Sequence, residues 1–224
     1  ISLAGQCWRL ETGRSPRSPE QSIFAQLLPS LGSVNLSAAQ RQAQQAWSVW
    51  IATVGQRFPQ DPVAQTSALT RCAPQQLPAG VIQLASLQGV ALVIDFPALV
   101  GAPVALDLSV LGAVQPVFTA LFQTLAQLGW TDLLFQTGGA ACFRGMKQPS
   151  DPTSPDSQAK AARTMSNHAL GTAADFQTFE NVQRSGGRMD PRVVALFEAF
   201  RFRWGRCFPV PDPMHFEYCG ATCG

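Results

Sequence analysis

The sequence predicts an α+β fold, in which a small antiparallel sheet with flanking helices is preceded by a mainly helical N-terminal region. Short apolar runs at residues 90–96 and 104–108 are typical of strands, and residues 114–128 carry apolar side chains at helical spacing. The first 76 residues differ from the rest, because they carry a helix-like stretch but no obvious chemistry. We therefore expect an N-terminal extension at 1–76 and a main domain at 77–224.

The composition is that of a folded protein with little net charge. Of the 224 residues, 46% are hydrophobic and 13% are charged, which is enough apolar material for a substantial core. A net charge of +2 is too small to indicate nucleic-acid binding. The most apolar stretch, residues 89–114, is interrupted by two aspartates and two prolines, so we expect no stable membrane insertion. The chain opens with Ile1 and shows no leader pattern, and we expect a processed or trimmed N-terminus.

One long helix is predicted in the N-terminal region. Ser37 suits the N-cap position of a helix over residues 38–54, which is rich in Ala and Gln and carries Trp47 and Trp50. Four prolines between residues 56 and 80 predict irregular structure there.

The later part of the chain alternates between strands and helices. Gly129 ends the helix that begins at residue 114, and Asp190 with Pro191 opens another that runs to about residue 200. Residues 147–165 are polar and predict a loop long enough to be a mobile flap. The remaining segments read as strands, of which the first is broken by two glycines and leads to Arg144: residues 133–143, 172–176 and 216–219.

Six cysteines favour disulfide bonds and an oxidising compartment. One alternative is that some are buried thiols. Another is a zinc site that combines His215 with Cys207, Cys219 or Cys223, although no Cys-x-x-Cys pair supports it.

The only two histidines of the chain lie in short segments rich in metal-binding residue types. A catalytic zinc ion takes three protein ligands from His, Asp, Glu or Cys and keeps a fourth position for water. His168, Asp175 and His215 supply such a set, and Asp212 is a nearby carboxylate able to handle the proton of that water. We therefore predict one catalytic zinc ion (Zn2+) in the sheet domain.

The pattern Ser-x-His-x-x-Gly-x-Ala-x-Asp at residues 166–175, followed by Asp-x-x-His at 212–215, resembles a family of zinc peptidases. The family comprises D-alanyl-D-alanine carboxypeptidases and L-alanyl-D-glutamate endopeptidases, including VanY-like enzymes and phage endolysin peptidases. Residues 137–144 resemble the family's arginine-bearing strand. Residues 190–194 and 202–205 resemble its helix and Trp-Gly turn. The resemblance covers roughly residues 114–218 and is weaker over 81–113.

The resemblance implies a role for each matching position. It makes His168, Asp175 and His215 the zinc ligands, Asp212 the catalytic carboxylate, Arg144 the arginine that steadies the carbonyl or a substrate carboxylate, and Ser166 and Trp204 substrate-binding residues. Arg201 and Arg206 depart from the pattern, because glycines are expected there. Glu217 is expected to contact a ligand from behind. The aromatic cluster of Phe197, Phe200, Phe202 and Trp204 is predicted to be core more than substrate platform. The arginines at 201, 203 and 206 could be a solvated face.

The family resemblance implies a zinc-dependent hydrolase that cleaves stem peptides of peptidoglycan outside the cytoplasm, in the periplasm or after secretion. An endopeptidase acting on a bond such as L-Ala-D-Glu is the first expectation, and a D,D-carboxypeptidase is the second. An antibacterial toxin with a cognate immunity or inhibitor protein would use the same chemistry. A zinc-stabilised binding module, as in Hedgehog signalling domains, is a further alternative, but Asp212 and Arg144 argue against it because a structural site needs neither.

Overall fold

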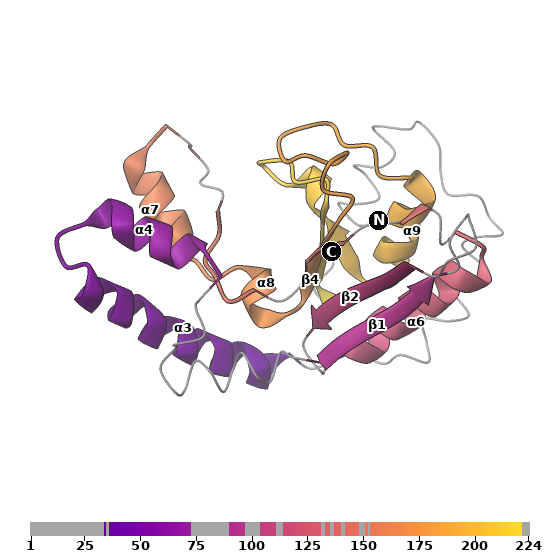
Figure 1. Ribbon diagram of the computed structural model, residues 1–224, viewed down its shortest axis with the longest axis horizontal. Helices are drawn as coiled ribbons and strands as arrows, with labels where there is room; N and C mark the ends of the chain where they lie inside the picture. Colours follow the sequence, from indigo (N-terminus) through magenta and orange to yellow (C-terminus); the bar gives the residue numbers. More distant parts are fainter. Residues whose placement is uncertain are drawn as a thin grey trace.

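The structure is a computed structural model. It describes residues 34, 36–72, 90–96, 104–110, 114–130, 133–134, 137–139, 142–147, 151 and 153–220. The described residues form a four-stranded antiparallel sheet, a separate two-stranded sheet and several helices, which confirms the predicted α+β class. In Figure 1, β1 and β2 lie in front of α6, and α3, α4 and α7 lie on the left. Within the described residues, no helix is long and apolar enough to cross a membrane.

Two helices form the described part of the N-terminal region, α3 (Ser37–Arg57) and α4 (Pro62–Thr70). The predicted long helix is confirmed, although Leu36 occupies the N-cap position and Ser37 is already helical. The prediction of irregular structure was wrong for α4. Asp61 caps this helix by accepting a 2.9 Å hydrogen bond from the backbone N–H of Ala64, and Pro62 lies in the first turn, where a proline costs no hydrogen bond.

The larger sheet has the strand order β3 (Thr137–Gly139), β4 (Ala173–Phe176), β6 (His215–Tyr218) and β5 (Phe202–Trp204). The two predicted strands nearest the C-terminus are confirmed. The strand predicted at 133–143 is regular only over β3, where the register with β4 shifts between Thr137 and Gly139. The segment expected as a Trp-Gly turn begins as strand β5 and continues as a 3₁₀ turn, Gly205–Cys207.

The smaller sheet pairs β1 (Val90–Phe96) with β2 (Val104–Val110) in antiparallel register, Val90 opposite Val110 and Phe96 opposite Val104. Both strands were predicted.

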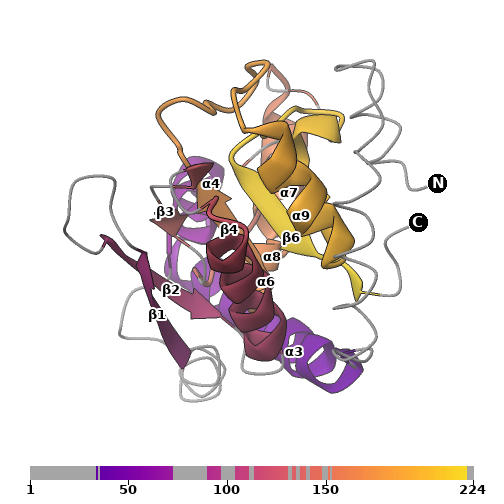
Figure 2. The same ribbon diagram turned by 90° about the vertical axis from the view of Figure 1, so that its right-hand side faces the viewer.

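Helices α6 (Gln115–Gln127) and α9 (Pro191–Ala199) lie side by side against the larger sheet (Figure 2). Both were predicted with their end signals: Gly129 has a φ of 66°, and Asp190 accepts from the N–H of Arg192 at 2.8 Å. A cluster of buried rings fills the space between these helices and the sheet, with centroids 4.1–6.4 Å apart: Phe118, Phe122, Phe176, Phe197, Phe202 and Phe216. The prediction that Phe197 and Phe202 belong to the core is confirmed.

The polar segment predicted as a flap at 147–165 contains a helix instead, α7 (Pro155–Arg163). Ser154 caps it by accepting from the N–H of Ser157 at 3.3 Å, and Pro155 occupies the first turn. Figure 1 shows α7 lying against α4. The short helix α8 (Asn167–Leu170) follows and leads directly into β4.

A disulfide bond joins Cys72, just after α4, to Cys142, two residues before Arg144. Cys207 and Cys219 are also disulfide-bonded, so the expectation of disulfides over free thiols is confirmed for the described cysteines.

Candidate metal centre

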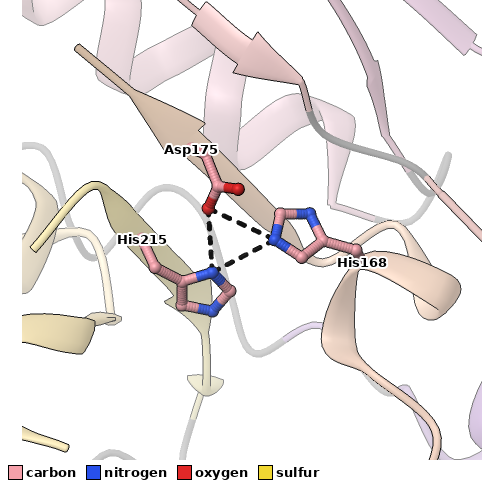
Figure 3. A group of neighbouring side chains, drawn as sticks. All are labelled: His168, Asp175 and His215. Carbon is pink, nitrogen blue, oxygen red and sulfur yellow. Dashed lines mark hydrogen bonds and ion pairs between the residues drawn. The ribbon is translucent and has the colours of Figure 1, made fainter. Parts of the chain in front are cut away.

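Three elements bring the predicted ligands together: α8 carries His168, β4 carries Asp175 and β6 begins with His215 (Figure 3). Asp175 and His215 are direct partners across two antiparallel strands, so their side chains lie next to each other on one face. His168 reaches the same point because α8 is one short turn, which ends at Gly171 with a φ of 71°.

The three ligand atoms form a nearly equilateral triangle. Nε2 of His168 lies 3.1 Å from Nδ1 of His215 and 3.2 Å from Oδ1 of Asp175, and the remaining side measures 3.0 Å. Tetrahedral zinc with bonds of about 2.0–2.1 Å separates its ligand atoms by about 3.3 Å, so the donor set and its spacing fit zinc. Among the described residues, His168, Asp175 and His215 form the group of side chains that could hold a metal ion.

Glu217 determines which ring nitrogen of His215 carries the hydrogen. Nε2 of His215 lies 3.2 Å from Oε2 of Glu217, which as a carboxylate can only accept, so Nε2 carries the hydrogen. A neutral His215 therefore turns the lone pair of Nδ1 toward the carboxylate of Asp175, an arrangement that requires a cation between them. Burial lowers the pKa of His215, but the hydrogen bonds and charges of Asp175 and Glu217 outweigh it and raise the pKa to about 9. The two carboxylates beside His215 thus favour positive charge at this point of the site.

Glu217 supports His215 from behind, as predicted, and is itself held firmly. Its carboxylate accepts from Nε of Arg203 at 2.8 Å, from the Nη2 of the same arginine and from the side-chain amide of Asn167. Burial raises the pKa of Glu217, but these partners and His215 outweigh it and lower the pKa to about 2. A ligand histidine backed by a carboxylate in this way keeps its tautomer and ring orientation.

Asp212 begins the turn that leads into β6. Its carbonyl accepts from the N–H of His215 at 3.0 Å, so Asp212 and the candidate ligand His215 share one turn, which contains Pro213. Oδ2 of Asp212 accepts from Nε2 of Gln183 at 3.0 Å, whereas Oδ1 is buried without a hydrogen-bond partner in the described part of the chain. Burial raises the pKa of Asp212, and the charges of His215, His168 and Arg144 act against that rise.

Arg144 lies close enough to Asp175 and Asp212 to interact with both charges. Burial lowers the pKa of Arg144, and the attraction of these two carboxylates raises it. Lys147 also interacts with these charges. Partial burial and the charge of Arg144 lower the pKa of Lys147, whereas the charges of Asp175 and Asp212 raise it.

Ser166 and Trp204 are both buried and both hold other site residues in place. Oγ of Ser166 accepts from the N–H of His168 at 3.2 Å, and Nε1 of Trp204 donates to the carbonyl of Pro213 at 2.8 Å. Only 8% of Ser166 and 4% of Trp204 is exposed, so direct contact of either with substrate stays a prediction.

The two expected glycine positions differ in the structure. Arg201 has a φ of 66°, the left-handed conformation that favours glycine, so the expectation has a physical basis there. Arg206 donates from Nε to the carbonyl of Gly186 at 2.8 Å and has ordinary backbone geometry.

Gln183, Lys147, Asn167 and Arg203 contribute to the site but were not predicted to do so. Asn167 adjoins a ligand inside the recognised motif, and Arg203 lies opposite Glu217 in the β5–β6 pairing. The placement of Asn167 could have been inferred from the motif, whereas that of Arg203 depends on the β5–β6 pairing, which the sequence did not predict. Gln183 comes from a loop 29 residues away from Asp212 and had no local signal.

Residues 159–218 match a family model described as D-alanyl-D-alanine carboxypeptidase. This segment contains the His–Asp–His group together with Asp212, Ser166 and Trp204, whereas Arg144 lies before it. No curated protein matches the chain, and no solved structure does. Residues 159–218 are thus similar to a zinc-dependent peptidase family, and they carry a group of side chains that could bind the metal.

Proposed function

We propose that the protein is a zinc-dependent peptidoglycan hydrolase that cleaves bonds of the stem peptides. The observation that carries this proposal is the combination of a three-atom ligand triangle with a nearby carboxylate whose Oδ1 is buried and unpartnered within the described residues. A metal site with only a structural role would need no such carboxylate beside it.

The residues around the triangle support a hydrolytic mechanism. Zinc, when bound, supplies a Lewis acid that acidifies water and polarises a carbonyl group. Asp212 would accept the proton of the attacking water at Oδ1 and pass it to the leaving amine. Its raised pKa suits this role, because a base works best when its pKa approaches the working pH. Arg144 would stabilise negative charge on the carbonyl oxygen or hold a substrate carboxylate.

An L,D-endopeptidase acting on a bond such as L-Ala-D-Glu is our first candidate. A D,D-carboxypeptidase is the second, favoured by the description of the matching family model. Arg144 and Lys147 suit both candidates, since each substrate presents a carboxylate near the bond that is cut.

Peptidoglycan lies outside the cytoplasm, and we propose that the protein works there, in the periplasm or as a secreted enzyme. The disulfide bonds support this location, because they persist in oxidising compartments. An immunity or inhibitor protein would be its partner if the enzyme attacks competitors.

The test is mass spectrometry of muropeptides after incubation with the zinc-loaded protein, with and without a chelator. We expect cleavage products that disappear with the chelator, and their masses identify the bond. Intact muropeptides in both samples would contradict the proposed activity.

Asp212→Asn separates an enzyme from a zinc-stabilised binding module. The variant keeps the size of the side chain but removes the basic carboxylate, so zinc should stay bound while turnover falls by about 10²- to 10⁴-fold. Turnover near the wild-type level would show that Asp212 is not the base. Loss of zinc would make Asp212 a ligand.

A further inference from the structure

We propose that the α3–α4 helix pair positions Arg144, and that Trp47, Leu69 and Cys72 are the residues through which it acts. The proposal rests on the proposed function, because it explains how a region outside the matched segment supports the arginine of that site. It also gives the N-terminal region a role that its sequence did not suggest.

The backbone around Arg144 is held on one edge by residues 164–168. The two segments run antiparallel, with a bridge between Gly145 and Met165. Three backbone N–H groups donate to carbonyl oxygens across this edge: Cys142 to His168 at 3.0 Å, Ser166 to Arg144 at 3.1 Å and Met146 to Thr164 at 2.8 Å. This edge connects Arg144 to the segment that carries the ligand His168.

The opposite edge is held by the end of α4. The N–H of Gly145 points away from residues 164–168 and donates to the carbonyl of Leu69 at 2.7 Å. Carbonyls in the last turn of a helix lack a partner within the helix, so this bond satisfies both groups. The disulfide between Cys72 and Cys142 adds a covalent link on the other side of Arg144.

The face opposite the Arg144 side chain is packed against α3. Successive side chains of an extended segment point to opposite faces, and Phe143 is buried against Trp47 with ring centroids 5.5 Å apart. Nε1 of Trp47 donates to the carbonyl of Arg163 at 2.8 Å, at the end of α7. A side chain at Gly145 would overlap the carbonyl oxygen of Ala162 in α7, so the segment fits closely between these helices.

These contacts hold the backbone that carries Arg144 in place. Its segment is hydrogen-bonded along both edges and covered on one face, and the side chain of Arg144 interacts with the charges of Asp175 and Asp212. If the helix pair acts through Arg144, disturbing it should matter only while Arg144 is present. A purely structural role would lower activity equally with and without the arginine.

The main test compares Trp47→Phe with Trp50→Phe, each made in the wild-type protein and in Arg144→Ala. Trp50 is a matched control, because it lies in the same helix, is 5% exposed and has an Nε1 without a hydrogen-bond partner among the described residues. Trp47→Phe should keep zinc and reduce muropeptide turnover by about tenfold, since displacing a catalytic group by about 1 Å can cost up to about 10²-fold. The same change should have less than about a twofold effect in Arg144→Ala, as expected for coupled residues. Trp50→Phe should leave muropeptide turnover unchanged in both the wild-type and the Arg144→Ala background.

A second variant, Cys72→Ser with Cys142→Ser, should show the same dependence on Arg144. Equal loss in both backgrounds, or loss of zinc from Trp47→Phe, would overturn the proposal. Amide hydrogen exchange gives a readout without substrate: exchange over residues 142–147 should quicken in Trp47→Phe and not in Trp50→Phe. If the wild-type protein cleaves no muropeptide, the proposed function fails, and this exchange comparison still decides whether the helix pair holds the segment. Identical exchange in both variants would refute the positioning role.

Discussion

Two regions build this site in different ways. Residues 159–218 supply the ligand triangle from a short helix and two paired strands, so the local backbone sets where the side chains meet. The α3–α4 pair supplies no ligand and reaches the site through a carbonyl, a disulfide and a ring contact. The candidate metal ligands thus come from one short stretch of the chain, whereas the segment that carries Arg144 is held by contacts with distant residues.

The strongest test of this division is His215→Ala. Removing one of three ligands should abolish most zinc binding and all detectable turnover, because no other histidine except His168 exists to replace it. Metal analysis of the purified variant measures the effect, with His168→Ala expected to behave alike. Full zinc occupancy in either variant would show that the site lies elsewhere.

Arg144→Ala tests the role of the residue that the α3–α4 pair is proposed to position. The variant should fold and keep zinc, and its turnover should fall by about 10²-fold, as for removal of one donor to a developing oxyanion. Zinc content and turnover are measured on the same preparation. Loss of zinc would break the comparison, because Arg144 would then belong to the metal centre itself.

Glu217→Gln sharpens the comparison within residues 159–218. Loss of the negative charge behind His215 should weaken zinc binding by about tenfold, at the lower end of the effects known for groups that orient metal ligands. Competition with a chelator measures the affinity. Glu180→Gln is a control, since Glu180 is exposed, and equal affinities in all three proteins would remove Glu217 from the metal centre.

Glu198→Gln should change stability and leave the metal untouched. Burial raises the pKa of Glu198 to about 7, and its Oε1 is buried without a partner in the described regions. The folded protein therefore holds a proton on Glu198 that the unfolded chain releases near the ordinary glutamate pKa of 4.5, so stability is lost as pH rises from there toward 7. The variant should have a higher Tm than wild type at pH 8 and a similar Tm at pH 5. A Tm difference that does not depend on pH would contradict this account.

Helix ends were predictable where polar caps and apolar spacing agreed. Asp190 and Pro191 marked α9 because buried apolar residues followed at regular spacing. Asp61 with Pro62 and Ser154 with Pro155 are the same kind of start signal, yet α4 and α7 were missed. The prolines suggested loops, and α7 buries only two alanines, so its apolar pattern is faint.

The three candidate ligands could be picked out from the sequence because each lies in a motif with fixed spacing, and the structure brings them together. Partners that arrive through tertiary structure could not, and Gln183, which holds Asp212 from a loop, is the clearest case. Trp204 was predicted to bind substrate, a role that stays a prediction; in the structure its Nε1–H donates to the carbonyl of Pro213 inside the protein. Its burial follows from the pairing of β5 with β6, which a linear pattern does not reveal.

The disulfide bond between Cys72 and Cys142 also restricts the unfolded state of the oxidised chain. It joins residues 70 positions apart, and closing a loop of that length removes unfolded-state entropy worth about 4 kcal/mol. The denatured ensemble of the oxidised chain is therefore much smaller than that of the reduced chain. A protein held together in this way reaches its full stability only after oxidation, and a reducing environment would return that entropy to the unfolded state.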